Sequence, residues 1–189
     1  GRKNFIFSLF STDDTKSGRM IDRKVLNEIA KAVFAMAEVK TGALIVIEQD
    51  VKLGDYERTG IAIDAEVTSQ LLINIFEHNT PLHDGAVLIR DNRIVSATCY
   101  LPLSDNLDIN KSLGTRHRAG IGVSEVSDSI TVIVSEETGG VSLAYNGMLY
   151  RGLTRDNFPA KIEELSKNEP ITKKMRWWKG LGKHEKSNS

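Results

Sequence analysis

The apolar residues of the first fifty positions change from a helical to an extended pattern. Apolar side chains recur at intervals of three and four residues over 25–37, which predicts an amphipathic helix. Asp22 is its expected N-terminal cap, and Gly42 is the glycine expected to end it. The run 43–47 that follows is short, branched and wholly apolar, which is typical of a strand buried on both faces.

The rest of the chain adds two helical segments and several hairpins. A second helix is expected over 67–76, with Asp64 as its cap, and a last one over 154–167. Apolar runs separated by short polar turns predict β-hairpins over 86–97 and 130–150. The predicted fold is therefore α/β in the mixed α+β style, with a central mixed β-sheet of about six or seven strands surrounded by helices.

The composition is that of one globular domain. A chain of 189 residues with 40% apolar content can bury one sizeable core. Its single cysteine, Cys99, excludes an internal disulfide framework and a cysteine zinc cluster. No apolar run approaches the ~20 residues of a membrane span, and no signal-peptide pattern is present. The chain begins with Gly rather than Met, so we expect a processed chain or a fragment.

The charge is balanced overall but unevenly placed. Lys and Arg number 25, as do Asp and Glu, which argues against a dedicated nucleic-acid binder. Residues 173–189 contain six basic side chains, one acid and two tryptophans. We therefore distinguish an irregular segment 1–19, a body 20–168 and a basic, Trp-containing tail 169–189. The tail is expected to be a flexible solvated end, with contact to a membrane surface or a nucleic-acid backbone as the alternative.

Three clusters of polar residues do not fit a simple solvated face. The first is His83-Asp84-Gly85-Ala86, directly before an expected strand. A carboxylate beside an imidazole at the mouth of a sheet can bind Mg²⁺ or Mn²⁺, and a glycine lets a ligand approach the backbone. The alternative, favoured when this segment is taken alone, is an ordinary Asp-Gly turn.

The second cluster places two arginines around a histidine, in Thr115-Arg116-His117-Arg118. Arginine forks match phosphate oxygens in bidentate geometry. A helix that starts at Thr115 would add backbone N–H groups to such an anion site. A basic surface turn is the equally weighted alternative.

The third cluster, Ser135-Glu136-Glu137, lies at the tip of an expected hairpin. The serine hydroxyl can donate to a phosphate, and either glutamate can support a metal or orient a hydroxyl. A solvated turn is the favoured alternative without further context. Phosphate-loop, dinucleotide-binding, zinc-peptidase and nucleophile-elbow motifs are absent from the sequence. The residues alone thus predict an α/β domain with a candidate metal and phosphate site.

Two of these clusters together resemble a known pair of motifs. Asp84-Gly85-Ala86, followed about thirty residues later by Gly114-Thr115-Arg116-His117-Arg118, resembles the Asp-Gly-Ala and Arg-His-Arg motifs of the diadenylate cyclase domain family. The resemblance covers about residues 20–165 and is strongest to the membrane-anchored cyclases of Gram-positive bacteria. It implies condensation of two ATP into cyclic di-AMP and two pyrophosphates, by attack of a 3′-hydroxyl on an α-phosphate, with Mg²⁺ or Mn²⁺ as cofactor.

The same resemblance implies roles for individual residues. Asp84 is implied to be the main catalytic carboxylate, and His83 a second metal ligand beside it. The remaining implied site residues are the phosphate-binding and catalytic set Thr115, Arg116, His117 and Arg118, the nucleotide-lining Gly85 and Ala86, the hairpin residues Ser135, Glu136 and Glu137, and the adenine-contacting Tyr100 and Leu101. For Tyr100 and Leu101, plain packing at a strand end is the alternative.

The reaction also has consequences for assembly and location. If each subunit holds one ATP, two sites must face each other, which predicts a catalytic homodimer. The resemblance implies a membrane-bound regulator and a phosphoglucosamine mutase as partners, and no nucleic acid. Segment 1–19 would be the stump next to removed transmembrane helices. The full-length protein is then expected at the cytoplasmic face of the cell membrane, with this chain as a soluble cytosolic fragment.

Two alternative functions remain open from the sequence. One is a metal-dependent nucleotidyl transferase that uses another nucleotide. The other is a catalytically silent nucleotide-binding regulatory module, whose expected signature is loss of Asp84 or of an arginine in the second cluster. Neither residue type is lost here.

Overall fold

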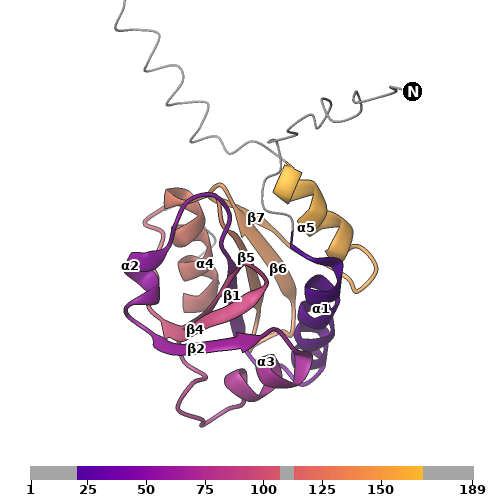
Figure 1. The fold of residues 1–189 in the computed structure, drawn as a ribbon. Coiled ribbons are helices and arrows are strands. Elements are labelled where there is room, and N and C mark those ends of the chain that lie inside the picture. Colours follow the sequence, from indigo (N-terminus) through magenta and orange to yellow (C-terminus); the bar gives the residue numbers. More distant parts are fainter. Residues whose placement is uncertain (1–20, 107–112, 168–189) are drawn as a thin grey trace, which may run out of the picture.

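A computed structural model describes residues 21–106 and 113–167, and these ranges fold around one sheet (Figure 1). In chain order the elements are α1 (Arg23–Glu38), β1 (Ala43–Ile47), α2 (Gly54–Glu57), β2 (Ile61–Glu66), α3 (Ser69–Phe76), β3 (Ala86–Arg90), β4 (Arg93–Cys99), α4 (Thr115–Val126), β5 (Ile130–Val134), β6 (Val141–Tyr145), β7 (Met148–Tyr150) and α5 (Phe158–Lys167). The expected irregular segment 1–19 and basic tail 169–189 lie outside the described residues. None of the described helices has the length and apolarity needed to cross a bilayer.

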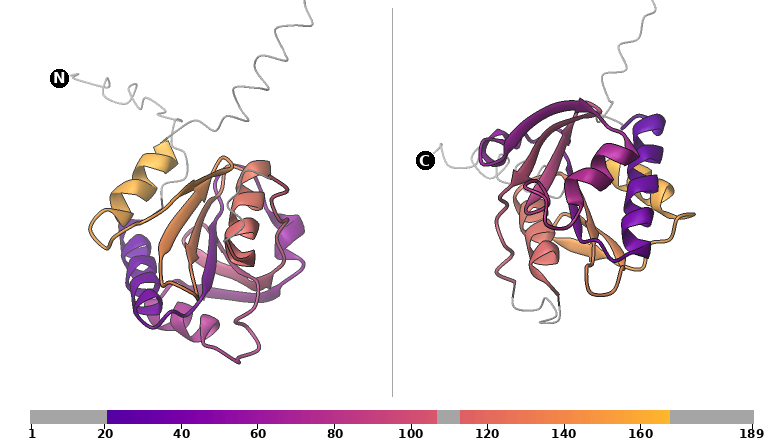
Figure 2. Two further views of the ribbon diagram at one scale, coloured as in Figure 1. Left: turned by 180° about the vertical axis from the view of Figure 1, so that it is seen from behind. Right: turned by 90° about the horizontal axis from the view of Figure 1, so that it is seen from below.

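The strands form one mixed sheet in the order β2-β4-β3-β1-β5-β6-β7. β1 pairs in parallel with β3, and the other neighbouring strands pair antiparallel. Helices α1, α3 and α5 cover one face of the sheet, whereas α4 and the short α2 lie on the other (Figure 1 and Figure 2). The predicted mixed sheet surrounded by helices is therefore confirmed.

β1 is the centre of the sheet and is buried along its whole length. Ala43, Ile45 and Ile47 belong to the core beneath α1, and Leu44 and Val46 belong to the core beneath α4. Each large apolar side chain buried in this way contributes about 1.5–3 kcal/mol. Because both faces of the strand are covered, its sequence is continuously apolar rather than alternating.

The strand register gathers one end of four neighbouring strands. Ala43 at the start of β1 pairs with Val134 at the end of β5, and Ala86 at the start of β3 pairs with Cys99 at the end of β4. β1 and β3 run parallel, so their two starts lie at the same end of the sheet. This end of the strands, formed by the loops before β1 and β3 and after β4 and β5, is named the Ala43 edge below. The name refers to the ends of these strands and not to the outer strands β2 and β7.

The sequence pattern did not predict β2, and it therefore also misplaced the start of α3. β2 is an outer strand whose side chains are exposed or half-buried, so it lacks the apolar signal of a strand. Asp64 lies within this strand with a φ of 50°, so its prediction as a helix cap was wrong. The cap is Thr68, whose Oγ1 accepts a hydrogen bond from Leu71 N at 3.2 Å. Asp22 does occupy the N-cap position of α1, without a side-chain cap bond.

The prediction that Gly42 ends α1 was also wrong. The helix ends at Glu38, Lys40 takes a left-handed φ of 56°, and Thr41 N donates to Met36 O at 2.8 Å. Gly42 lies past this turn and is buried next to β1. Its lack of a side chain must therefore serve something other than helix termination.

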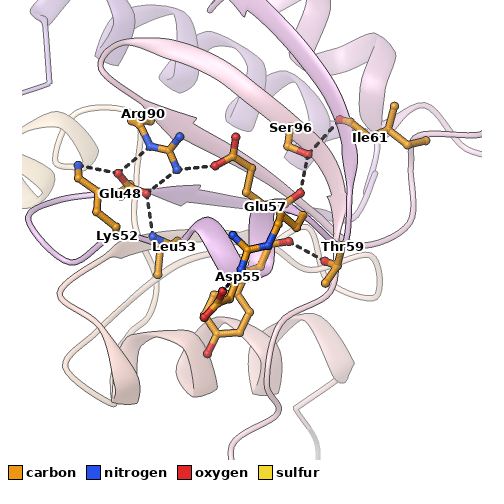
Figure 3. Close-up of polar contacts among 11 residues, drawn as sticks. Glu48, Lys52, Leu53, Asp55, Glu57, Thr59, Ile61, Arg90 and Ser96 are labelled. Carbon is orange, nitrogen blue, oxygen red and sulfur yellow. Dashed lines mark hydrogen bonds and ion pairs between the residues drawn. The ribbon is translucent and has the colours of Figure 1, made fainter.

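At the opposite ends of β1 and β3, a buried carboxylate binds a cluster of charged side chains (Figure 3). The side chain of Glu48 is 0% exposed, and its two oxygens accept from Arg90 at 2.8 and 2.9 Å. They also accept from Lys52 Nζ and Leu53 N, each at 2.9 Å. The same guanidinium donates to Glu57 at 2.6 Å. The cluster therefore ties the ends of β1 and β3 to α2.

The ion cluster makes the fold sensitive to acid. Burial alone would raise the pKa of Glu48, but the hydrogen bonds from Arg90, Leu53 N and Lys52 outweigh burial and lower the pKa to about 2. The ordinary value is 4.5, so ionised Glu48 stabilises the fold fully above about pH 4.5. This contribution is lost as the pH falls from there toward 2.

Arg90→Met should leave the Glu48 carboxylate buried without its main partner. We expect the free energy of unfolding in urea to fall by about 3–5 kcal/mol, because an uncompensated buried charge is costly. The deficit should shrink as the pH falls below about 4.5, because Arg90 no longer lowers the pKa of Glu48 and protonation removes the uncompensated charge. Arg93→Met is the matched control on the same hairpin. Arg93 is 46% exposed and pairs with an exposed Asp64, so we expect a loss of at most ~1 kcal/mol. Equal losses in the two variants would contradict the role given to the buried cluster.

Candidate functional site

The three polar clusters meet at the Ala43 edge. Asp84 lies just before β3, and Ser135 and Glu136 directly follow β5, which the register places at the same end of the sheet. The start of α4 joins this edge through an ion pair between Arg116 and Glu136. Residues far apart in the sequence thereby form one region.

Asp84 lies exposed in a turn whose shape depends on glycine. Its Oδ1 accepts from Gly85 N at 3.0 Å. Gly85 has a φ of 84°, and a side chain there would come 2.8 Å from the backbone carbonyl carbon of Thr98. Thr98 itself has a φ of 56°, an unusual conformation for a β-branched residue. Gly85 is therefore needed for the turn that presents Asp84, and Ala86 follows it as a buried residue of β3.

His83 has one ring nitrogen engaged and the other available. Nδ1 lies 2.6 Å from Thr80 O, which can only accept, so Nδ1 carries the hydrogen. In the neutral ring, Nε2 then presents its lone pair to a ligand. A metal-binding histidine commonly has this arrangement, with its second nitrogen fixed by a backbone carbonyl. The ring also packs edge-on against His78, with 5.5 Å between centroids.

The donor set at this turn fits a metal that keeps outside ligands. Among residues 21–106 and 113–167, no three His, Cys, Asp or Glu side chains gather as a metal site. His83 and Asp84 offer one nitrogen and carboxylate oxygens. Mg²⁺ and Mn²⁺ accept such ligands and complete their coordination with water and phosphate oxygens. The two residues therefore suit a metal that a phosphate ligand helps to hold.

The residues of the Arg-His-Arg segment point in different directions, because each step along a helix turns by about 100°. Arg116 Nη1 donates to Glu136 Oε2 at 2.6 Å. His117 is 7% exposed and lies inside the core. Arg118 Nη2 donates to Ser104 O at 3.1 Å, and Ser104 N donates back to Arg118 O at 3.0 Å. Arg116 thus contacts the hairpin after β5, whereas Arg118 holds the segment that follows β4.

The first turn of α4 adds backbone donors beside Arg116. The helix begins at Thr115, which is exposed, as expected for a helix start at the second cluster. The N–H groups of His117 and Arg118 donate to Gly114 O. Those of Thr115 and Arg116 belong to the first turn, where a helix supplies no acceptor. An anion placed here would meet both backbone N–H groups and a guanidinium.

The hairpin after β5 is closed by its own backbone. Ser135 N donates to Gly140 O at 3.0 Å, and Gly139 N donates to Ser135 O at 2.8 Å. Ser135 Oγ accepts from Thr138 N at 3.2 Å, which leaves the hydroxyl hydrogen to be donated elsewhere. Glu136, next along the chain, is paired with the arginine of α4. The hairpin therefore presents one hydroxyl donor and one engaged carboxylate.

Tyr100 and Leu101 leave the end of β4 on a fixed backbone. Tyr100 N donates to Thr59 Oγ1 at 2.9 Å, and that hydroxyl donates to Tyr56 O at 2.6 Å. Tyr100 is 68% exposed, while Leu101 is half-buried against the core beneath α4. The Tyr100 ring is thus accessible to a ligand, and its contact with adenine stays a prediction. Leu101 fits either interpretation.

The structure adds Gly42 to the site, although the sequence pattern assigned this residue to the end of a helix. A Cβ atom on Gly42 would lie 2.8 Å from Cζ of Arg116 and 3.1 Å from Cβ of Glu136. Gly42 is therefore part of the Ala43 edge rather than of a helix end. Thr59 and Ser104 were also missed, because they act through backbone groups of distant residues. No motif in the sequence signals such contacts.

Comparison with known proteins places this site in a family. A family model described as DisA bacterial checkpoint controller nucleotide-binding (DAC) matches residues 30–149. The chain is 52% identical over 171 residues to the cyclic di-AMP synthase CdaA of Bacillus subtilis, covering 88% of this chain and 63% of that protein. It is 48% identical over 179 residues to a diadenylate cyclase of Listeria monocytogenes, covering 90% and 64%. The chain thus spans less than two thirds of these relatives.

Solved structures support the same relationship. The crystal structure of a double mutant of DacA from Staphylococcus aureus has a TM-score of 0.74 and 49% identity, covering 77% of this chain and 97% of that one. A structure described as a hypothetical membrane spanning protein from Bacillus cereus has a TM-score of 0.66 and 46% identity. It covers 68% of this chain and 63% of that chain. The mixed α+β fold is thus shared with relatives of nearly half identical sequence.

The environment of His117 predicts a neutral ring. Burial lowers the pKa of His117 below the ordinary 6.5, the positive charge of Arg151 lowers it further, and Glu137 opposes both. A folded-state pKa below 6.5 means that stability is complete above about pH 6.5 and declines as the pH falls below it. We expect imidazole NMR signals of His117 to titrate below pH 6.5. His117→Gln should flatten the decline of stability between about pH 6.5 and 5. A titration midpoint at or above 6.5 would contradict a buried neutral ring.

Proposed function

The chain belongs to the DAC nucleotide-binding family, and on that premise we propose that it is the catalytic part of a diadenylate cyclase. It would condense two ATP into cyclic di-AMP and two pyrophosphates. The observation that carries the proposal is the convergence of Asp84 and Arg116 on the Ala43 edge. These residues come from the two motifs that mark the family, and the named synthase CdaA is 52% identical over the matched region.

The proposed reaction sets clear demands on the site. In each half, the 3′-oxygen of one nucleotide bonds to the α-phosphorus of the other. The bond from that phosphorus to the bridging oxygen breaks, pyrophosphate leaves with the electron pair, and the hydroxyl proton passes to a base. The two nucleotides then exchange roles, which closes the ring. The site must therefore hold a carboxylate near the hydroxyl and positive charge near the leaving group.

Asp84 meets the first demand. Its carboxylate is exposed just before β3, on a turn whose left-handed backbone at Gly85 and close contact with the Thr98 backbone require glycine. A carboxylate hydrogen-bonded to the 3′-hydroxyl would orient it and draw its proton in the transition state. Gly85 would then lie along the nucleotide, whereas the buried Ala86, which the resemblance also implied, would support the turn from within β3.

The start of α4 and the hairpin after β5 meet the second demand. Arg116, with the backbone N–H of Thr115, would bind phosphate oxygens as the charge on the leaving group grows. Ser135 would donate its free hydroxyl hydrogen to the same phosphates. Arg118 would act at one remove, by holding the segment after β4 in place. Neutral His117 would support the start of α4 from its buried side and would not carry charge to the phosphates.

The end of β4 suits the nucleotide base. The exposed ring of Tyr100 would stack on adenine, and Leu101 would give an apolar contact beside it. The bond from Tyr100 N to Thr59 fixes the backbone from which the ring projects. This assignment separates the base from the phosphates, which lie toward α4.

A divalent metal, Mg²⁺ or Mn²⁺, would neutralise phosphate charge when bound. His83 Nε2 and the Asp84 carboxylate would hold it, with phosphate oxygens and water as its other ligands. Glu136 is engaged by Arg116, and Glu137 acts on His117, so neither is assigned to the metal here.

The reaction needs two nucleotides, and one Ala43 edge would hold one. We therefore place two chains with these edges facing each other, as a homodimer that need only form transiently. The full-length protein would lie at the cytoplasmic face of the cell membrane, with a membrane-bound regulator and a phosphoglucosamine mutase as partners. The Bacillus cereus relative described as a hypothetical membrane spanning protein supports an association of the full-length protein with a membrane.

One assay separates this proposal from its alternatives. The purified chain is incubated with ATP and either metal at several protein concentrations, and the products are identified by chromatography and mass. Cyclic di-AMP with pyrophosphate, at a rate per chain that rises with concentration, would support the cyclase and its dimer. Bound but unchanged ATP at every concentration would support the regulatory module. Another linked nucleotide, formed from a different triphosphate, would support the second transferase.

Asp84→Asn should abolish product formation while leaving the fold intact, because it removes charge but little volume. We expect turnover to fall at least ~100-fold, as for loss of a general base. Asp55→Asn is the matched control, since Asp55 is exposed on α2 and pairs only locally with Arg58. Both variants should keep the wild-type melting temperature. Near-normal turnover in Asp84→Asn would remove this residue from its central role.

His83→Ala should raise the metal concentration needed for half-maximal activity, by roughly tenfold or more, because one ligand is lost. Excess metal should partly restore turnover. His78→Ala serves as the control, because it removes the neighbouring ring contact and no proposed ligand. The metal dependence is measured by titration of the assay with Mg²⁺ and with Mn²⁺. An unchanged midpoint in His83→Ala would assign the metal to other groups.

A further inference from the structure

Arg116 lies directly against a glycine backbone. A Cβ atom on Gly42 would come 2.8 Å from both Cζ and Nη1 of Arg116. Carbon atoms pack best at about 3.5–4.0 Å, so any side chain at position 42 would push the guanidinium outward by about 1 Å. The depth of this arginine at the Ala43 edge therefore depends on residue 42 having no side chain.

The backbone at Gly42 gives no other reason for a glycine. The described glycines with left-handed φ are Gly85, Gly139, Gly147 and Gly152, and Gly42 is not among them. The turn that ends α1 uses Lys40 instead. Alanine would fit the local backbone, so the requirement for glycine lies in the space taken by Arg116.

Glu136 holds the guanidinium beside the same glycine. Its Oε2 accepts from Arg116 Nη1 at 2.6 Å, and its Cβ would lie 3.1 Å from a side chain at Gly42. The Arg116 side chain is 22% exposed, so it is largely held within this contact. The absence of a side chain at Gly42 lets the guanidinium lie deep, and the bond to Glu136 sets its orientation. A guanidinium has five N–H donors, so others remain for a ligand.

We propose that Gly42 is a positioning residue for nucleotide binding, which acts by letting Arg116 lie deep enough to meet phosphate oxygens. This inference rests on the proposed function, because it takes Arg116 to be a phosphate-binding residue. Displacements of about 1 Å at such a group can cost large factors in binding and rate. Gly42 would not itself touch the nucleotide.

The neighbours of Gly42 make the proposal testable without unfolding the chain. The two atoms nearest to a new Cβ belong to the far end of a flexible arginine side chain, which can swing away, and the third, Glu136 Cβ at 3.1 Å, needs to shift by only a few tenths of an ångström. Gly42→Ala should therefore change the melting temperature by no more than about 2 °C. Gly54→Ala is the matched control, because the nearest atom to its new Cβ is Arg58 Nη1 at 3.8 Å.

The experiment measures binding of 3′-deoxy-ATP with Mg²⁺ by calorimetry. This analogue lacks the attacking hydroxyl, so it binds without turnover. Gly42→Ala and Arg116→Ala should each weaken binding by about tenfold or more, while Gly54→Ala should change it less than about twofold. The double variant Gly42→Ala with Arg116→Ala should bind no more weakly than Arg116→Ala alone, because both changes act on one contact.

Three results would overturn the proposal, and they differ in what they say of the proposed function. Wild-type affinity in Gly42→Ala would overturn the positioning role and leave the cyclase proposal standing. Losses that multiply in the double variant would do the same, since Gly42 would then act independently of Arg116. Failure of the wild-type chain to bind the analogue would overturn both proposals. A shift of KM with unchanged kcat for ATP in Gly42→Ala would further support a role in phosphate binding.

Discussion

The parallel pairing of β1 with β3 is the constraint on which the rest of the structure depends. A parallel pair needs a long crossover, which here contains α2, β2 and α3. It also places like ends of both strands together. Gly42 and Asp84, which precede the two strands, therefore meet at one edge, and Glu48 and Arg90, at their other ends, meet at the opposite edge. An antiparallel pair would have separated the members of both groups.

The two edges use charge in opposite ways. At the far edge, the buried Glu48 receives donors from Arg90, Lys52 and Leu53 N, so its bonding capacity is filled within the chain (Figure 3). At the Ala43 edge, Asp84 is exposed and Arg116 has donors to spare. A filled cluster stabilises α2 against the sheet, whereas unfilled groups can bind a ligand. The same residue types therefore serve stability at one end and chemistry at the other.

The sequence predicted those parts of the fold in which burial leaves a periodic or continuous apolar pattern. The central strand 43–47 and both hairpins have that pattern, and the structure confirms them. β2 has an exposed outer face and no such pattern, so it was missed, and Asp64 within it was mistaken for a cap. The site residues were found through motif spacing, which identifies side chains but not their directions. Arg116 and Arg118 point in different directions because successive residues of α4 project at different angles around the helix. Only the fold defines which of these directions faces the site.

Gly42 and Gly85 show why a glycine is hard to interpret from one sequence. Both stand just before or near the start of a strand, where either is equally well explained as a turn residue. At Gly85 the backbone requires it, with a φ of 84° and the Thr98 backbone close by. At Gly42 the backbone does not require it, and an arginine from a helix more than seventy residues later does. The first kind of requirement is local and has a sequence signature in Asp-Gly. The second depends on which loops the sheet brings together, so it becomes visible only when the register of β1 and β5 is known.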